Sequence, residues 1–186
     1  GKGARCVFGV IVGTGTGAGV VIDGRLLTGP NGIAGEWGHN PLPWPRAEEI
    51  PGPPCYCGKR GCIETFLSGP GLAVDYRSTA GGASDPERIA AAAESGDPLA
   101  VAALNRYEDR MARSLASVIN ILDPDVIVLG GGLSNLTRLY RSVPALIPRY
   151  LFSDGASIRL RRPAHGDSSG VRGAAWLWEA GSSTGP

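Results

Sequence analysis

Three of the four cysteines fall within one short segment, residues 55–64, which reads CYCGKRGCIE. Cys55, Cys57 and Cys62 offer three thiolate ligands, and zinc prefers four nitrogen or sulfur ligands in a tetrahedral arrangement. Of the two histidines in the sequence, His39 lies just upstream, whereas the other lies far along the chain. The spacing therefore predicts a structural Cys3His zinc site with His39 as its fourth ligand.

Two other states of these thiols stay open from the sequence, namely unligated thiols and a redox pair. A disulfide between Cys55 and Cys57 would be strained, and three free thiols this close together would be prone to oxidation. The remaining cysteine, Cys6, lies alone in an apolar run, so a disulfide framework fits poorly. Reduced thiols in a cytoplasmic protein are the expectation, with zinc ordering a loop that has little apolar core.

A second segment suited to chemistry is the glycine-rich stretch GTGTGAG at residues 13–19. It lacks the GK[ST] end of a P-loop, and the strand-like VVIDG that follows argues against a dinucleotide fingerprint, which must lead into a helix. The backbone amides of such a hairpin can hold phosphate oxygens. An ordinary flexible turn is the alternative.

Another glycine cluster, residues 130–132, follows the apolar run DVIVL, and Ser134 or Asn135 is expected to cap the next helix. In α/β sheets, ligands bind beyond the carboxyl ends of strands, where glycine permits close approach of the backbone. The alternative is a plain strand-to-helix turn. Two such loops in one domain favour a nucleotide site, whereas Gly170 and Gly173 are expected to serve helix packing.

The composition is that of a globular domain and argues against several classes of partner. Of 186 residues, 42% are hydrophobic and 19% are charged, and the net charge is +1. This balance gives no electrostatic reason to bind nucleic acid or an anionic membrane. No apolar run approaches the roughly 20 residues of a membrane span, and no secretory signal is present. Because the sequence enters a strand at once and without methionine, an upstream part is expected.

The elements that position these residues follow from periodicity and from Gly and Pro. An antiparallel meander is predicted first, with the glycine-rich stretch as its turn, and then a long irregular loop over 30–61. The long helix presents one apolar face, formed by Leu104, Tyr107, Met111, Leu115, Val118 and Leu122. Strands are predicted at 6–12, 20–24, 25–29, 123–132 and 156–160. Helices are predicted from 63 with a break at 69–71, from 85, over 98–122, after 134 and from 168 or 169.

Together, GTGTGAG, GEWGHNPLPW, CYCGKRGCIE and DPDVIVLGGG resemble the ROK family of sugar kinases and sugar-responsive repressors, most closely its bacterial fructokinases. GEWGH combined with CxCGxxGCxE is the specific part, and the resemblance runs from Val7 to about Trp178. It implies an α/β, ribonuclease H-like (actin/hexokinase-type) ATPase lobe, with a mixed sheet, an antiparallel meander, flanking helices and a zinc-stapled loop. Residues 1–180 would be the C-terminal lobe, carrying a zinc and sugar loop at 30–64, and 181–186 a tail.

The resemblance also implies roles for individual residues. His39 would ligate zinc through one ring nitrogen and donate from the other to a sugar oxygen, as a metal-bound imidazole can. Magnesium would sit on the phosphates of ATP. Sugar hydroxyls would be bound by Glu36, His39 and Glu64, zinc by His39, Cys55, Cys57 and Cys62, and ATP by Gly13, Thr14, Gly15, Thr16, Gly17, Gly19, Gly131 and Gly132.

The implied activity is ATP-dependent phosphorylation of a hexose by the parent protein, with fructose at its 6-hydroxyl first and mannose or glucose as near alternatives. The family's catalytic aspartate stands in an upstream NDA-like motif that is absent here. No catalytic residue is therefore expected in this chain, and the chain alone is expected to transfer no phosphate. A repressor's sensor domain and a stand-alone zinc-stabilised binding domain are the alternatives, and the intact GTGTGAG favours the kinase. A homodimer is compatible with the sequence.

Overall fold

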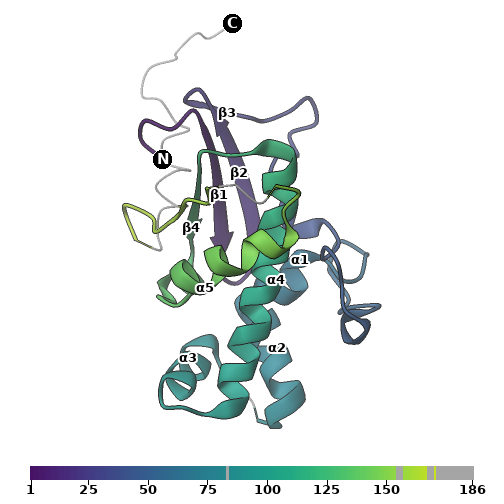
Figure 1. Ribbon diagram of the computed structural model, residues 1–186. Helices are drawn as coiled ribbons and strands as arrows, with labels where there is room; N and C mark the ends of the chain where they lie inside the picture. The colour runs from purple at the N-terminus through teal and green to yellow at the C-terminus, as the bar shows by residue number, and fades with distance from the viewer. Residues whose placement is uncertain (83, 154–156, 167–169, 171–186) are drawn as a thin grey trace, which may run out of the picture.

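The computed structural model describes residues 1–82, 84–153, 157–166 and 170. Within them, one mixed five-stranded sheet has the order β3-β2-β1-β4-β5 (Figure 1). The first three strands form the predicted antiparallel meander, while β4 joins β1 in parallel and β5 joins β4 in parallel. This arrangement with flanking helices confirms the predicted fold class. The strands are β1 (Cys6–Val12), β2 (Thr16–Ile22), β3 (Arg25–Leu26), β4 (Val126–Gly130) and β5 (Leu160–Arg161).

The long helix α4 connects two groups of elements (Figure 1). Its first half is flanked by α2 and α3 at a distance from the sheet, and its second half lies beside α5 near the sheet. No helix in the described ranges is long and apolar enough to cross a membrane. The helices are α1 (Ile63–Leu67), α2 (Gly69–Ala80), α3 (Pro86–Glu94), α4 (Pro98–Leu122) and α5 (Leu139–Leu146). The 3-10 turns are η1 (Trp37–His39), η2 (Ala47–Glu49), η3 (Gly132–Asn135) and η4 (Ile147–Tyr150).

Helix α4 begins and ends where the sequence predicts. The Asp97 side chain accepts a hydrogen bond of 2.8 Å from the Ala100 amide, and Pro98 occupies the first turn, where its missing N–H costs nothing. The buried Tyr107 hydroxyl donates to the Leu67 carbonyl at 2.9 Å, which ties α4 to α1. The predicted apolar face lies in or against the core: Leu104, Tyr107, Met111 and Leu115 are buried, and Val118 and Leu122 are partly buried.

The glycine-rich hairpin is shorter than the sequence predicts. Strand β2 already starts at Thr16, so the turn comprises only residues 13–15, and Gly17 and Gly19 pair inside the sheet with Ile11 and Gly9. The prediction of a turn through residue 19 was wrong because these amides are taken up by the β1–β2 ladder.

Two predicted helix boundaries also differ. The break between α1 and α2 falls at Ser68, whose hydroxyl accepts from the Gly71 amide at 3.1 Å, so 69–71 form the first turn of α2. Ser134 does not cap a helix but closes η3 by donating to the Gly131 carbonyl at 2.6 Å. Asn135 ends that turn, and α5 begins after Arg138 without a side-chain cap.

The carboxyl-terminal predictions are covered only in part. Strand β5 overlaps the predicted range 156–160 at Leu160 alone. A Cβ built on Gly170 would lie 3.5 Å from Ile11 of β1, an ordinary contact distance, whereas packing against the strand at 123–132 was predicted. The closing helix from Ser168 or Ser169, Gly173 and the tail at 181–186 lie outside the described residues.

A buried ion-pair network connects the loop at residues 30–64, here the metal loop, to α4. Glu49 is 6% exposed, and its carboxylate contacts Arg113 at 2.8 and 2.9 Å and Arg110 at 2.7 Å. Arg113 also donates to the Trp44 carbonyl at 2.7 Å. Burial alone would raise the pKa of Glu49, but the hydrogen bonds from Arg113 and Arg110 outweigh it and lower the pKa to about 2.

We expect Glu49→Gln to lower the free energy of unfolding by about 3 kcal/mol, because it leaves buried guanidinium charge without its partner. Since the folded pKa of Glu49 lies below its unfolded value of 4.5, this contribution is present above about pH 5 and is lost as the pH falls toward 2. Urea unfolding at several pH values measures both effects. The difference between wild type and Glu49→Gln should shrink on acidification, and the exposed Glu48→Gln control should show no difference. A gap that is constant with pH would contradict the assignment.

Candidate functional site

The GEWGH segment lies directly against strand β2 because two of its residues lack a side chain. A Cβ at Gly35 would collide with the Ala18 carbonyl, and one at Gly38 with the Thr16 carbonyl. The Ala18 amide also donates to the Gly35 carbonyl at 3.1 Å. These contacts place Glu36 and η1 beside the start of β2, next to the hairpin.

The four predicted metal ligands come together. Their ligand atoms all lie within 4.8 Å of one another. His39 Nδ1 lies 3.5 Å from Cys55 Sγ, and Cys57 Sγ lies 3.6 Å from Cys62 Sγ. Two sulfurs on a tetrahedral zinc ion with bonds of about 2.3 Å would be separated by about 3.8 Å. The spacing and the soft donor set therefore fit zinc.

The backbone around the cysteines is ordered by its own hydrogen bonds. The Cys55 amide donates to the Lys59 carbonyl at 2.8 Å, and the Gly58 amide donates to the Cys55 carbonyl at 3.0 Å. A hydrogen bond from the Lys59 amide lowers the pKa of Cys57 to about 7, whereas burial raises the pKa of Cys62 to about 12. One thiol thus ionises near neutral pH, and thiols must ionise to ligate a metal.

His39 presents its two ring nitrogens to different surroundings. Nδ1 faces the thiol cluster, while Nε2 lies 2.8 Å from the Tyr56 hydroxyl and 4.0 Å from Glu36 Oε2. A histidine whose Nδ1 binds a metal carries its proton on Nε2. Nε2 would therefore act as a donor on the side of Glu36 and Tyr56.

Glu64 links the metal loop to the hairpin. It stands in the first turn of α1, two residues after Cys62, and its Oε2 accepts a hydrogen bond of 2.9 Å from the Thr16 amide. A Cβ at Gly15 would lie 2.8 Å from the same oxygen, so glycine leaves room for the carboxylate. One carboxylate oxygen is thus bound to the hairpin, while Oε1 remains as an acceptor.

Tyr56, between two of the cysteines, was missed by the sequence analysis. Its ring meets the His39 ring edge-on, with centroids 5.0 Å apart, and the residue is 83% exposed. Burial raises its pKa, followed by the negative charges of Glu64 and of Cys55 and then that of Glu36. No sequence signal could have found it, because CxCG treats this position as arbitrary.

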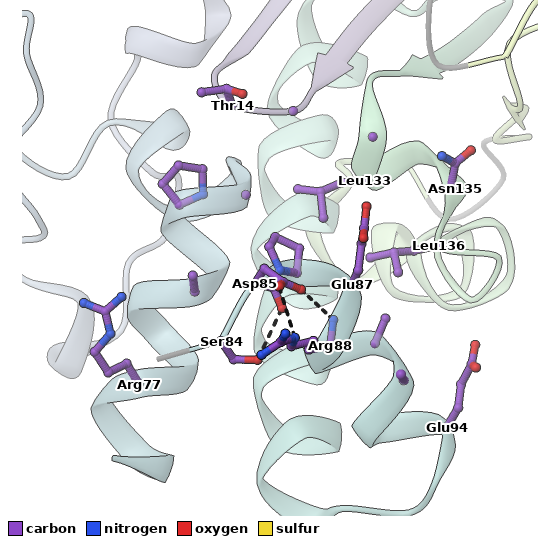
Figure 2. A pocket seen from close by; sticks show the side chains of 18 residues that line it. Thr14, Arg77, Ser84, Asp85, Glu87, Arg88, Glu94, Leu133, Asn135 and Leu136 are labelled. Carbon is purple, nitrogen blue, oxygen red and sulfur yellow. Dashed lines mark hydrogen bonds and ion pairs between the residues drawn. The ribbon is translucent and has the colours of Figure 1, made fainter. Parts of the chain in front are cut away.

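A cavity of about 1120 Å³ opens on the other side of the hairpin (Figure 2). Gly13, Thr14 and Gly132 line it, as predicted for ATP-binding residues, and Figure 2 places Thr14 across the cavity from α3. Gly131 packs instead against β1, where a Cβ would lie 2.5 Å from the Val12 carbonyl, and its φ of +81° suits glycine.

The remaining cavity walls come from segments to which the sequence analysis assigned no ligand role. Helix α2 contributes Arg77, α3 contributes Arg88 and Glu94, and η3 contributes Leu133 and Asn135. Figure 2 shows Leu133 of η3 and Glu87 of α3 among the residues that line the cavity. The one signal in the sequence was Asp85-Pro86, which correctly marks the start of α3 at the cavity edge, but it gives no side-chain direction.

The mixed sheet with its flanking helices is an α/β lobe of the actin/hexokinase type, and sequence comparison gives the family. The ROK family matches residues 1–181, so the chain belongs to the ROK family. It is 39% identical over 175 residues to an N-acetyl-D-glucosamine kinase of Yersinia pseudotuberculosis and 41% identical to one of Salmonella newport. Each match covers 92% of this chain and 58% of the relative.

Solved structures agree. A ROK family glucokinase from Streptomyces griseus, in complex with glucose and AMPPNP, matches with a TM-score of 0.85 and 26% identity, covering 97% of this chain and 62% of that one. A ROK hexokinase from Thermus thermophilus matches with a TM-score of 0.81 and 33% identity, covering 94% of this chain and 57% of that one. A ROK family transcriptional regulator, a homologue of the E. coli MLC protein, matches with a TM-score of 0.69 and 29% identity, covering 85% of this chain and 41% of that one. The chain thus spans 57–62% of the length of the kinases named here and 41% of that of the regulator.

We expect the zinc-loaded chain to hold one zinc ion and Cys57→Ser to bind zinc at least 10- to 100-fold more weakly, since it loses a ligand rather than an outer partner. Metal analysis and competition with a chromogenic chelator measure this, and limited proteolysis should show new cleavage within the metal loop. Cys6→Ser, which changes a thiol outside the cluster, is the matched control and should retain zinc. Equal zinc content in both variants would contradict the site.

Proposed function

We propose that this chain is the hexose- and ATP-binding lobe of a ROK-family kinase. One observation carries the proposal: the hydrogen bond between Glu64 Oε2 and the Thr16 amide. It connects the metal loop, where the sugar would lie, to the hairpin that borders the cavity, where the phosphates would lie. Phosphoryl transfer depends on holding acceptor and phosphate side by side, so this shared element suits a kinase.

On the sugar side, zinc would be held by the His39 and cysteine cluster and would supply a fixed orientation of the imidazole. His39 Nε2–H would then donate to a sugar oxygen, while Glu36 and the free oxygen of Glu64 would accept from sugar hydroxyls. Carboxylates suit this task because each oxygen accepts more than one hydrogen bond. The chain's residues bind and orient the sugar in this proposal. The proton acceptor of the reaction is assigned to the upstream motif that the resemblance implies.

On the nucleotide side, the cavity between the hairpin, α2, α3 and η3 would take ATP with Mg²⁺ on its phosphates. Thr14 would contact the phosphates through its backbone amide, and Gly132 would face the nucleoside. Gly13 lines the cavity too, but its amide donates to the Gly15 carbonyl at 2.9 Å and so would shape the turn rather than bind phosphate. Gly17, Gly19 and Gly131 would act through the backbone geometry that they allow, since they do not line the cavity.

We propose a pyranose of the glucose type as the hexose substrate. The relatives named above are kinases of N-acetyl-D-glucosamine and of glucose. They do not favour fructose, the substrate expected from the sequence. Fructose and mannose therefore remain predictions without support from these relatives. We place glucose and N-acetyl-D-glucosamine first, because Glu36, His39 and Glu64 would serve either sugar.

A repressor's sensor domain is the second candidate, because the ROK transcriptional regulator shares the fold at 29% identity. A sensor needs the sugar site but not the nucleotide cavity. The open cavity bordered by Gly132 and the hairpin therefore supports the kinase. A cytoplasmic location, where ATP and reduced thiols coexist, and a homodimer belong to the same proposal.

Glu64→Gln is expected to weaken hexose binding by about 10-fold or more, because it replaces a charged acceptor of hydroxyl hydrogen bonds by a neutral amide. Isothermal titration of the zinc-loaded chain with glucose, N-acetyl-D-glucosamine, fructose and mannose measures it and ranks the sugars. The exposed Glu48→Gln variant should bind as wild type does. Binding unaffected by Glu64→Gln would contradict the sugar site.

Gly132→Val is expected to weaken binding of a non-hydrolysable ATP analogue about 10-fold or more while leaving the fold intact. A Cβ at this position meets nothing within 4 Å, so the protein itself has room for the new side chain. The valine would project into the cavity and take up space that the nucleotide needs. Gly82→Val, equally unhindered and outside the cavity lining, is the control. Thermal unfolding checks the fold, and unchanged analogue affinity in Gly132→Val would contradict the nucleotide site.

A further inference from the structure

The Tyr56 hydroxyl sits on the ring nitrogen that the proposed function assigns to the sugar. Its distance to His39 Nε2 is 2.8 Å, and the edge-on packing of the two rings holds the phenol over the imidazole. Within the described residues, this hydroxyl has no other hydrogen-bond partner. The His39 side chain is 19% exposed, and the phenol is the group that contacts its Nε2.

A metal-bound His39 could donate a hydrogen bond to only one partner at a time. With Nδ1 on the metal, the imidazole has a single N–H, on Nε2, and that hydrogen can be donated in full to one acceptor. With a metal on Nδ1, the acceptor would be the Tyr56 oxygen, which lies 2.8 Å from Nε2. A sugar hydroxyl that is to accept the same hydrogen must replace it.

We propose that Tyr56 sets the affinity of the sugar site by occupying the His39 donor in the absence of sugar and leaving when a sugar hydroxyl takes its place. This inference rests on the proposed function. Tyr56 is a positioning residue in this role, since it acts on the ligand only through His39. Its effect is a constant penalty on every hexose that uses the Nε2–H.

The surroundings of Tyr56 allow this exchange. The residue is 83% exposed, so rotation of its side chain into solvent meets little obstruction. Its backbone lies between Cys55 and Cys57, whose ligation would keep the main chain fixed while the side chain moves. Glu36 and Glu64 remain in place as acceptors, and Glu64 keeps its bond to the Thr16 amide.

The test compares Tyr56→Phe, which removes the hydroxyl but keeps the ring, with wild type in the zinc-loaded chain. Isothermal titration with glucose and with N-acetyl-D-glucosamine should show tighter binding in Tyr56→Phe, by about 2- to 10-fold, the range of one net hydrogen bond. Tyr76→Phe is the matched control, because its hydroxyl makes no hydrogen bond within the described residues and lies away from the metal loop. Equal or weaker sugar binding in Tyr56→Phe overturns the inference.

A second measurement needs no sugar and separates this inference from the proposed function. Nitrogen-15 NMR of the imidazoles should show the His39 Nε2–H protected from exchange with water in wild type and in Tyr76→Phe, but exposed in Tyr56→Phe. An unprotected Nε2–H in the sugar-free wild type overturns the inference alone. If the signal is protected but the wild-type chain binds none of the hexoses, the sugar site of the proposed function fails, and the role of Tyr56 fails with it.

Discussion

The buried pair of Glu49 and Arg113 is the interaction on which the arrangement of the metal loop depends. The loop has few apolar side chains of its own, and a segment of this length gains little from burial. Arg113 in α4 donates hydrogen bonds to two groups of the loop, the Glu49 carboxylate and the Trp44 carbonyl. Arg110, also in α4, donates to the same carboxylate. Because α4 has buried residues from Ala100 to Ala116, the loop takes its position from a helix that is packed into the core.

A second constraint acts through backbone contact rather than charge. Gly35 and Gly38 allow the loop to lie directly on β2. At the first residue of β2, the Thr16 amide donates a hydrogen bond to Glu64. The hairpin of residues 13–15 therefore has the metal loop on one side and the large cavity on the other. Two ligands bound on these two sides would be separated by a single turn of backbone, which is the juxtaposition that group transfer between them requires.

The sequence predicted the parts of this structure that are governed by local rules. Helix α4 followed from its Asp-Pro start and its apolar period, and the metal cluster from ligand spacing. The hairpin was predicted too long because strand pairing, a nonlocal effect, overrides the turn tendency of glycine at Gly17 and Gly19. Ser134 was misassigned because its hydroxyl bonds locally to Gly131. The ion pairs to Glu49 join residues more than 60 positions apart, which no local pattern predicts. The contact of Tyr56 with His39 spans only 17 residues, but the metal-ligand motif leaves the residue between the two cysteines unspecified.

The ion pair and the metal hold different parts of the loop, and this division bears on what zinc contributes. Glu49 connects the middle of the loop to α4, and Trp37 packs edge-on against Phe8 in the core, so both points are fixed without any metal. The cysteine ligands lie beyond these points, and two of them are partly exposed. Zinc would therefore order the tip of the loop and the imidazole of His39 rather than the lobe as a whole. Its removal would act on sugar affinity first and on global stability second, the reverse of a zinc finger, in which the metal replaces the core.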